Sequence, residues 1–256
     1  MQITFLGTGT SHGVPMIGCE CATCRSDDPR DRRLRPSLLI RAADGTSLLV
    51  DAGPDLRAQA LTHAITRVDA IIFTHGHADH ILGLDDVRRY NSLMKRPMPL
   101  YADKVTLHEI TRMFGYAFDP DTPKGGGIPQ LELIEVQGPI TVGPLHVVPV
   151  PIWHGTRLIL GLRLGRFAYL TDCSAIPDES WALLEGVEVV VLDALRHRPH
   201  STHFSLEQAV AASRRIAAAQ TYFTHMCHDL PHAATNAQLP PGMALAYDGL
   251  QLTIAD

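Results

Sequence analysis

The amino-acid sequence predicts an α/β sandwich in which helices cover mixed β-sheets. Short runs rich in leucine, isoleucine and valine recur along the whole chain, and segments with helical periodicity separate many of them. Other runs are separated only by turn residues, which is typical of antiparallel hairpins. Hairpins and helix-separated strands together favour mixed sheets over a purely parallel, doubly wound sheet.

The composition fits one globular domain. The chain has 256 residues, of which 45% are hydrophobic and 19% charged, a balance that can fill a large core. No internal repeat or low-complexity tract divides it, so we expect a single domain over residues 1–256. The start of the chain does not resemble a secretory signal, and no apolar run approaches the roughly 20 residues of a membrane span. We therefore expect a cytoplasmic protein without a membrane partner.

The charge balance bears on the class of substrate. The formal net charge is −5 at pH 7, from 22 basic and 27 acidic residues. This balance removes the simplest electrostatic reason for binding long nucleic acid or an anionic membrane. Any anionic substrate must therefore be held by local positive charge.

Strands are expected where apolar runs end at turn residues. These runs are residues 2–6, 37–41, 47–50, 70–73, 158–164, 167–170, 187–192 and 221–223. The first runs into a loop with Gly7, Gly9 and Gly13, residues that allow close backbone approach. A closing hairpin is expected to turn at Asp248 and Gly249.

Helices are expected where apolar residues recur with helical spacing. These segments are residues 84–91, 105–113, 176–184 and 206–218. Pro177 stands at the start of the third helix, a position that proline favours. Ser205 and Gln208 predict a capping box at the start of the fourth.

A run of metal-binding side chains follows the expected strand at residues 70–73. His75, His77, Asp79 and His80 place three imidazoles and one carboxylate within six residues. Divalent metals of intermediate softness bind this mixture of nitrogen and oxygen. One tetrahedral ion cannot easily use four ligands from so short a segment, so the run predicts two neighbouring metals.

This H-x-H-x-D-H run resembles the signature of the metallo-β-lactamase superfamily. The fold of that family is an αβ/βα sandwich of two mixed β-sheets flanked by helices. The family pattern continues with a lone histidine after a strand, an aspartate at a strand end and a histidine near the carboxyl terminus. His154, Asp172 and His225 match these positions in order.

The resemblance implies how these side chains divide between two divalent metals, either zinc or manganese. One ion would be held by His75, His77 and His154 and the other by Asp79, His80 and His225, with Asp172 bridging them. Two such cations lower the pKa of a shared water and supply hydroxide at neutral pH. Asp51 matches an acidic residue of the family that orients a ligand histidine, although a simple turn aspartate before glycine stays an alternative.

Three clustered cysteines indicate a second kind of metal site. Cys19, Cys21 and Cys24 have C-x-C-x2-C spacing, which suits three thiolates on one structural zinc better than disulfides. The pattern is similar to that of the cyclic phosphodiesterases of the bacterial carbon–phosphorus lyase pathway. That resemblance implies His228 as the fourth ligand, with Cys227 as an alternative.

A histidine before the fourth expected helix matches a general acid. In related phosphodiesterases, including ribonuclease Z, a histidine in such a segment protonates the leaving alkoxide, and His203 matches it best. His197 and His200 lie nearby and stay alternatives. The resemblance thus implies catalytic roles for His203 and Asp79.

Together these features predict a metal-dependent phosphodiesterase acting on a small phosphodiester, with a cyclic diester expected. Hydroxide held between the two metals would attack phosphorus, and an imidazole would protonate the departing oxygen. We expect a homodimer whose partners are small substrates and not long nucleic acid. The alternatives are a ribonuclease Z-like nuclease, a thioester hydrolase and a non-catalytic zinc-binding scaffold.

Overall fold

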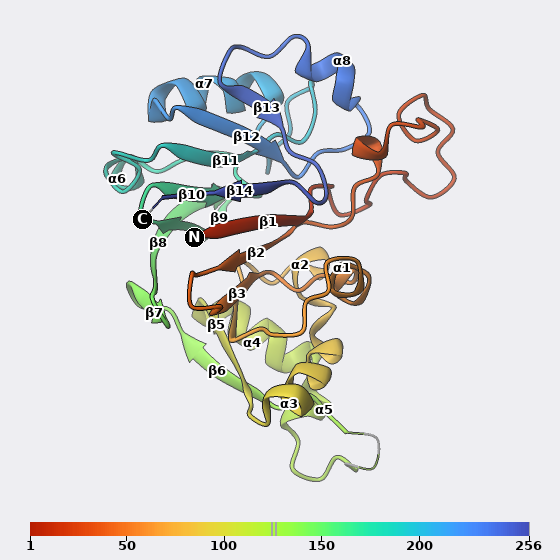
Figure 1. Ribbon diagram of the computed structural model, residues 1–256, viewed down its shortest axis with the longest axis vertical. Helices are drawn as coiled ribbons and strands as arrows, with labels where there is room; N and C mark the ends of the chain where they lie inside the picture. The colour runs from red at the N-terminus through yellow and green to blue at the C-terminus, as the bar shows by residue number, and fades with distance from the viewer. Residues whose placement is uncertain (124, 126, 256) are drawn as a thin grey trace.

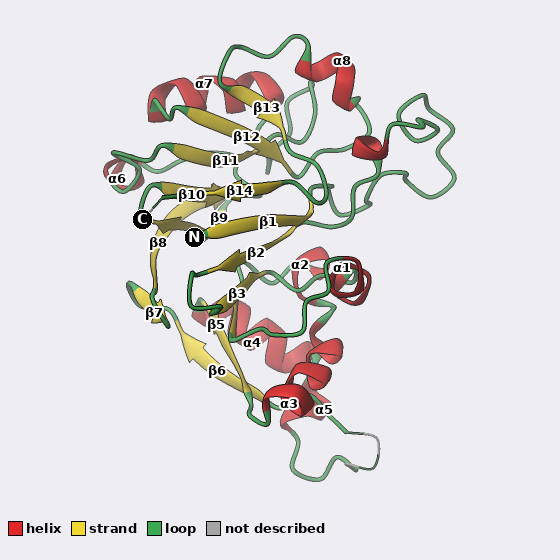
Figure 2. Cartoon of the chain, in the orientation of Figure 1, coloured by secondary structure: helices red, strands yellow, loops and turns green. Residues whose placement is uncertain are grey.

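The computed structural model describes residues 1–123, 125 and 127–255. In this part of the chain, two seven-stranded β-sheets pack face to face, and helices cover the outer side of each sheet (Figures 1 and 2). The layers therefore run helix, sheet, sheet, helix. This arrangement confirms the predicted αβ/βα sandwich.

The first sheet contains the amino-terminal strands and the last strand of the chain. In order across the sheet, its strands are β14 (Gln251–Thr253), β1 (Gln2–Gly7), β2 (Ser37–Arg41), β3 (Ser47–Val50), β4 (Ala70–Ile72), β5 (Met98–Ala102) and β6 (Leu131–Glu135). Pairing is antiparallel from β14 to β3 and parallel from β3 to β6. The carboxyl ends of β3 and β4 therefore meet at one edge.

The second sheet repeats this design with the remaining strands. In order, they are β13 (Met243–Leu245), β12 (Gln220–Thr224), β11 (Val189–Asp193), β10 (Phe167–Leu170), β9 (Arg157–Leu164), β8 (Leu145–His154) and β7 (Ile140–Val142). Pairing is parallel from β13 to β10 and antiparallel from β10 to β7. The carboxyl ends of β10, β11 and β12 therefore also share one edge.

The helices divide between the two outer faces (Figure 1). Over the first sheet lie α1 (Leu56–Thr62), α2 (Ala78–Ile81), the 3-10 helix η2 (Leu84–Val87), α3 (Arg88–Met94), α4 (Lys104–Met113) and α5 (Gly115–Phe118). Over the second lie α6 (Asp178–Ala182), α7 (Leu206–Ile216) and α8 (His232–Asn236). A short 3-10 helix, η1 (Pro29–Asp31), interrupts the long loop after β1.

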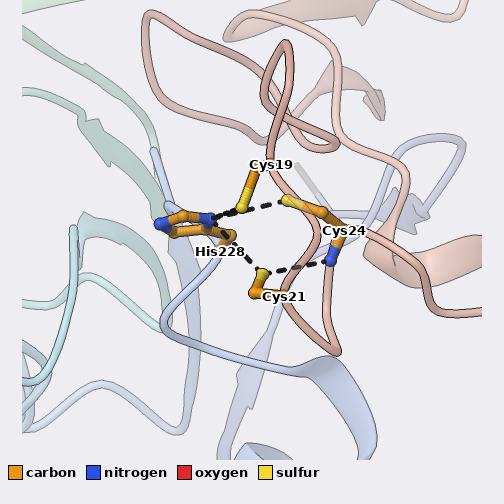
Figure 3. A group of neighbouring side chains, drawn as sticks. All are labelled: Cys19, Cys21, Cys24 and His228. Carbon is orange, nitrogen blue, oxygen red and sulfur yellow. Dashed lines mark hydrogen bonds between the residues drawn. The ribbon is translucent and has the colours of Figure 1, made fainter.

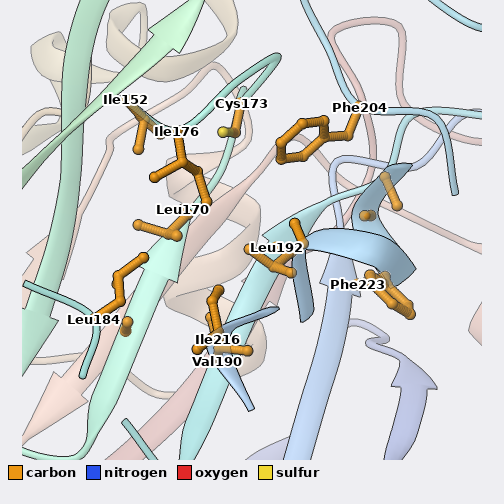
Figure 4. Packing of buried hydrophobic residues seen from close by; sticks show 14 of the residues in the cluster. Ile152, Leu170, Cys173, Ile176, Leu184, Val190, Leu192, Phe204, Ile216 and Phe223 are labelled. Atoms are coloured by element: carbon orange, nitrogen blue, oxygen red, sulfur yellow. The ribbon is translucent and has the colours of Figure 1, made fainter. Parts of the chain in front are cut away.

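Alternating side chains of each strand fill two different core layers. In β2, Leu38 and Ile40 pack between the sheets, whereas Leu39 packs toward the helices. On the other side, Leu192 and Phe223 of the second sheet pack with Ile216 of α7 (Figure 4). Because both faces of these strands are buried, their sequences read as continuous apolar runs.

The predicted strands agree with the structure to within two residues at each end, and β2, β3 and β10 agree at both ends. The prediction of a closing hairpin is wrong. The turn at Asp248 and Gly249 exists, but β13 before it pairs with β12, whereas β14 after it pairs with β1. At the turn between the two strands, the Asp248 carboxylate accepts hydrogen bonds from the Thr8 hydroxyl and the Leu34 N–H at 2.7 Å each, which hold the turn against the loop after β1.

Strands β5 to β8 are absent from the sequence-based expectations. In β8, Pro149 and Pro151 argue against a strand because proline cannot donate to a neighbouring strand. The structure accommodates them because β7 pairs only with residues 145–147, which leaves residues 148–154 with β9 as their single neighbouring strand.

The predicted helices differ from the observed helices mainly in their length. Residues 84–91 form η2 and the start of α3, and residues 176–184 form the shorter α6. Helix α7 ends at Ile216 because Ala217 adopts a left-handed conformation, and its capping box between Ser205 and Gln208 is present. In the described residues, no helix combines the length and apolar character needed to cross a bilayer.

Candidate metal centre

Three residues with acidic or imidazole side chains, each located just after a strand, have a strained backbone conformation. Asp51, Asp172 and His225 come after β3, β10 and β12, and their φ angles are 60°, 57° and 59°. A left-handed conformation costs a residue other than glycine on the order of 1 kcal/mol. Strain of this kind concentrates at functional sites, and here it occurs after one strand of the first sheet and two strands of the second.

The structure brings all seven predicted ligands together as two adjacent groups, and within each group the ligand atoms lie within 4.8 Å of one another. The groups are His75, His77 and His154, and Asp79, His80, Asp172 and His225. Asp172 lies between them: one carboxylate oxygen is 3.1 Å from Nε2 of His225 and 4.0 Å from Nε2 of His75.

The donor atoms of these groups fit divalent metals. Within the described residues, Nε2 of His75, His80 and His225 is buried and makes no hydrogen bond. A buried polar atom without a partner is costly, so these nitrogens need a ligand. Neutral imidazole nitrogens around shared carboxylates are the donor set that zinc and related ions bind.

Further hydrogen bonds fix the orientation of the candidate ligands. Nδ1 of His80 lies 2.7 Å from Asp51, whose carboxylate also accepts hydrogen bonds from the N–H and hydroxyl of Thr74. Nδ1 of His154 lies 2.8 Å from the carbonyl of Thr202. Each bond places a proton on Nδ1 and leaves Nε2 with a lone pair for a metal.

The protonation preferences of the histidines agree with cation binding. Burial lowers the pKa of His154 to about 4 and the pKa of His75 well below 6.5, so both imidazoles are neutral and free to act as ligands. Burial would also lower the pKa of His80. The neighbouring carboxylates, of which Asp172 acts most strongly, instead raise that pKa well above 6.5. The carboxylates therefore favour positive charge at this position.

His203 lies at the rim of the two groups. Its ring centroid is 4.8 Å from that of His154 and 4.7 Å from that of His225. His200 lies farther out, 5.3 Å from the His203 ring, with its Nδ1 accepting from Thr202. His197 lines a separate cavity beside α7, so the structure places it away from the metal groups.

The three predicted cysteines gather around His228 (Figure 3). Its Nδ1 lies 3.2 Å from the sulfur of Cys19 and 3.5 Å from those of Cys21 and Cys24. Among the described residues, this candidate ligand group does not include Cys227, whose sulfur instead accepts the Asp229 N–H. The donor set of three sulfurs and one nitrogen fits a tetrahedral zinc.

The buried side chain of Arg33 connects the two loops that meet at this site. Its guanidinium donates to the backbone carbonyls of Cys227 at 2.9 Å and Leu230 at 2.5 Å, and it pairs with Asp31. The cysteine loop and the loop that carries His225 are therefore held together independently of a metal.

A cavity of about 260 Å3 opens beside His203. The loop residues Ser11, His12 and Met16 form one side of it, and the segment around Arg196 and Arg198 forms the other. Arg198 pairs with Asp229, which also lines the cavity, at 3.6 Å, so Arg196 supplies the local positive charge on this side of the site.

Residues 46–226 match the model of the β-lactamase superfamily domain. A crystal structure of a diphosphatase from the PhnP family is 47% identical to this chain, covers 99% of it and 98% of its own chain, and superposes with a TM-score of 0.93. The chain belongs to the PhnP family of the β-lactamase superfamily. This assignment confirms the predicted relationship and the expectation of a hydrolase with the metallo-β-lactamase fold.

Two other relatives of this PhnP-family chain give less information about its function. An octanoyltransferase from Porphyromonas gingivalis is 38% identical over 99% of this chain, but the chain spans only 52% of that protein. The crystal structure of Zn2+-bound PqqB from Methylobacterium extorquens covers 99% of this chain and all of its own, with 19% identity and a TM-score of 0.77. At that identity, PqqB shows the shared fold alone.

Sequence reasoning missed Asp193 in this PhnP-family site. Asp193 ends β11, is fully buried and lies 3.0 Å from Nδ1 of His203. The signal was available, because Asp193 follows the run Val189–Leu192 much as Asp51 follows the apolar strand β3. An aspartate directly after a buried parallel strand lies at the edge where such sites form.

Proposed function

We propose that this protein is a metal-dependent phosphodiesterase that hydrolyses a small phosphodiester, with a cyclic diester as the expected substrate. The observation that carries the proposal is the position of His203, next to the candidate metal ligands and bonded to Asp193. An alkoxide leaves phosphorus poorly unless it is protonated, and a nearby imidazole can supply that proton. The likeness to a PhnP-family diphosphatase favours a diphosphate as a second candidate substrate, whose phosphate leaving group would not need the proton of His203.

The proposed metal ligands divide as the two groups do. His75, His77 and His154 would hold one ion, Asp79, His80 and His225 the other, and Asp172 would contact both. When bound, two divalent cations lower the pKa of a shared water and neutralise charge on phosphoryl oxygens. Cys19, Cys21, Cys24 and His228 would hold a separate structural zinc.

The protein's own side chains supply the remaining chemistry. Asp193 holds Nδ1 of His203, so Nε2 is the nitrogen that can give a proton to the leaving oxygen. Arg196 lines the cavity on the same side and can attract an anionic group of the substrate, whereas Arg198 is paired with Asp229. Departure of the leaving group toward this cavity therefore brings its oxygen to the acid.

The alternative functions explain fewer of these structural features. A thiolate leaves readily without a proton, so a thioester hydrolase would not need His203. A nuclease needs a broad basic surface, whereas this chain has a net charge of −5. A non-catalytic scaffold would give no role to a histidine held beside two metal groups. The cytoplasmic location and the homodimer stay predictions, which fractionation and light scattering can test.

Metal analysis combined with a substrate panel tests the proposal. The panel contains a five-membered cyclic phosphodiester, a diphosphate diester, bis-p-nitrophenyl phosphate and a thioester. We expect phosphodiester hydrolysis that is abolished by a chelator and restored by zinc or manganese. Hydrolysis of the thioester alone, or metal-loaded protein that is inert toward every phosphodiester, would contradict the proposal.

A further inference from the structure

A second cavity, of about 440 Å3, lies beside Asp79. Ser11, His12 and Met16 line both this cavity and the one beside His203. The loop that carries these residues therefore forms a wall between two spaces, one at Asp79 and one at His203. A substrate that reaches both spaces would have one part in the cavity beside Asp79 and another part in the cavity beside His203.

Apolar side chains from separate elements line the cavity beside Asp79. Ile17 is 99% exposed, and Leu82, just after α2, is 46% exposed, yet both face this same cavity together with Met16 and Pro54. A single exposed hydrophobic residue needs no explanation. Several that converge next to a candidate metal ligand are typical of a small-molecule subsite.

The backbone under both apolar walls is fixed. The Met16 N–H donates to the sulfur of Cys24 at 3.4 Å, and the Cys19 N–H donates to the Met16 carbonyl at 3.0 Å, so the cysteine group anchors the turn that carries Ile17. On the other wall, a Cβ on Gly53 would lie 2.0 Å from the carbonyl oxygen of Asp79. The chain before Leu82 is therefore closely packed, and the cavity is preformed.

Polar groups in the cavity narrow the choice of occupant. Ser11, His12 and Arg35 also line it, and the Arg35 guanidinium is paired with Asp55 at 2.9 Å. Because Asp55 matches that charge, the cavity is not primarily an anion site. Ser11 and His12 are exposed, and an alkyl chain would make no hydrogen bond to either of them. A heteroaromatic ring offers apolar faces to the hydrophobic walls and a polar edge to these groups.

We propose that this cavity binds a heteroaromatic group, of about the size of a nucleobase, on the part of the substrate that stays attached to phosphorus. The assignment of halves rests on the proposed function and applies to an acyclic diester, because ring opening of a cyclic diester keeps the leaving oxygen on the retained substituent. The leaving oxygen must depart toward His203, so the retained substituent faces Asp79. In that reaction, water provides the oxygen of the new P–O bond and releases one proton to solvent, from which His203 regains the proton that it donates. The P–O bond to the leaving group breaks with its electron pair on oxygen, and this oxygen takes the proton from His203.

Two esters with the same leaving group test this subsite: the p-nitrophenyl ester of thymidine 5′-monophosphate and methyl p-nitrophenyl phosphate. The variants are Ile17→Ser and Leu82→Ser, and the matched control is Leu61→Ser, an exposed leucine of α1 outside this cavity. We expect the ratio of kcat/KM for the thymidine ester to that for the methyl ester to fall about tenfold in each variant and to stay constant in the control. An unchanged ratio in both variants overturns the proposal.

A binding measurement separates this inference from the proposed function. If the metal-loaded protein hydrolyses neither ester, the phosphodiesterase proposal fails, and calorimetry with thymidine 5′-monophosphate decides the subsite alone. A Kd that rises about tenfold in Ile17→Ser and Leu82→Ser, but not in Leu61→Ser, supports the subsite. Equal Kd values in all four proteins, or no binding to any of them, overturn it.

Discussion

The carboxylate of Asp193 lies 3.0 Å from Nδ1 of His203 and also accepts the Phe204 N–H at 3.1 Å. These two contacts fix both the ring and the backbone that carries it. Nδ1 is occupied by the carboxylate, so the proposed proton transfer must use Nε2. The first two predictions depend on this relationship.

Replacing His203 with alanine should affect substrates according to their leaving groups. We expect kcat to fall by about 10² to 10⁴ on alkyl phosphodiesters, because their alkoxides need a proton, and to fall far less on p-nitrophenyl esters. Steady-state kinetics on both ester types, with metal content measured for each protein, provides the comparison. His200→Ala serves as the control, and equal losses on both ester types would remove His203 from the acid role.

The pH dependence of alkyl ester hydrolysis should follow the protonation of His203. Burial lowers the pKa of His203 below 6.5, so its protonated fraction is already small at neutral pH. We expect kcat for an alkyl ester to decrease as pH rises through that pKa, and kcat for a p-nitrophenyl ester to lack this decrease. Matching profiles for the two esters would argue against a proton from this imidazole.

The cysteine group should bind one zinc ion independently of the other metals. We expect Cys21→Ser and His228→Ala each to lose one metal ion per chain and to lower Tm by on the order of 10 °C, because a structural metal contributes directly to folding. Mass spectrometry of metal content and thermal unfolding measure the two effects. Cys227→Ser is the matched control; if it loses the ion while His228→Ala keeps it, Cys227 is the fourth ligand.

Asp51 should control metal affinity without contacting the substrate. Asp51→Asn replaces an oxygen that faces Nδ1 of His80 at 2.7 Å, so the imidazole loses the acceptor that orients it. We expect metal affinity to fall about 10- to 100-fold, measured by competition with a chromogenic chelator. Asp44→Asn, in an exposed turn, should leave the affinity unchanged. Equal affinities in the two variants would show that Asp51 is only a turn residue.

Asp248 should make folding stability depend on pH. Burial raises its pKa to about 7 in the folded protein, against about 3.9 in an unfolded chain. Between these values the folded state binds a proton that the unfolded state does not, so this stabilisation is lost as pH rises through about 7. From pH 5 to pH 8, wild type should lose about 2.5 kcal/mol more unfolding free energy than Asp248→Asn. Parallel denaturation curves at both pH values would contradict this expectation.

Local sequence patterns predicted much of the fold because their physical causes are local. The buried strands β2, β3 and β10 read as short apolar runs, and the capping box of α7 needs only Ser205 and Gln208. β8 could not be predicted in this way. Its prolines are tolerated only because residues 148–154 pair with β9 and not with β7, and the sequence contains no local sign of that arrangement.

The sequence by itself determined the types of ligands and their order along the chain, because three imidazoles and a carboxylate within six residues can hardly avoid sharing a site. Only the tertiary structure decided that β13 and β14 join different sheets, that Asp193 holds His203, and that Ile17 and Leu82 line one cavity. Spacing and periodicity constrain residues a few positions apart. Contacts between distant residues depend on how the whole chain buries its apolar surface while satisfying its polar groups.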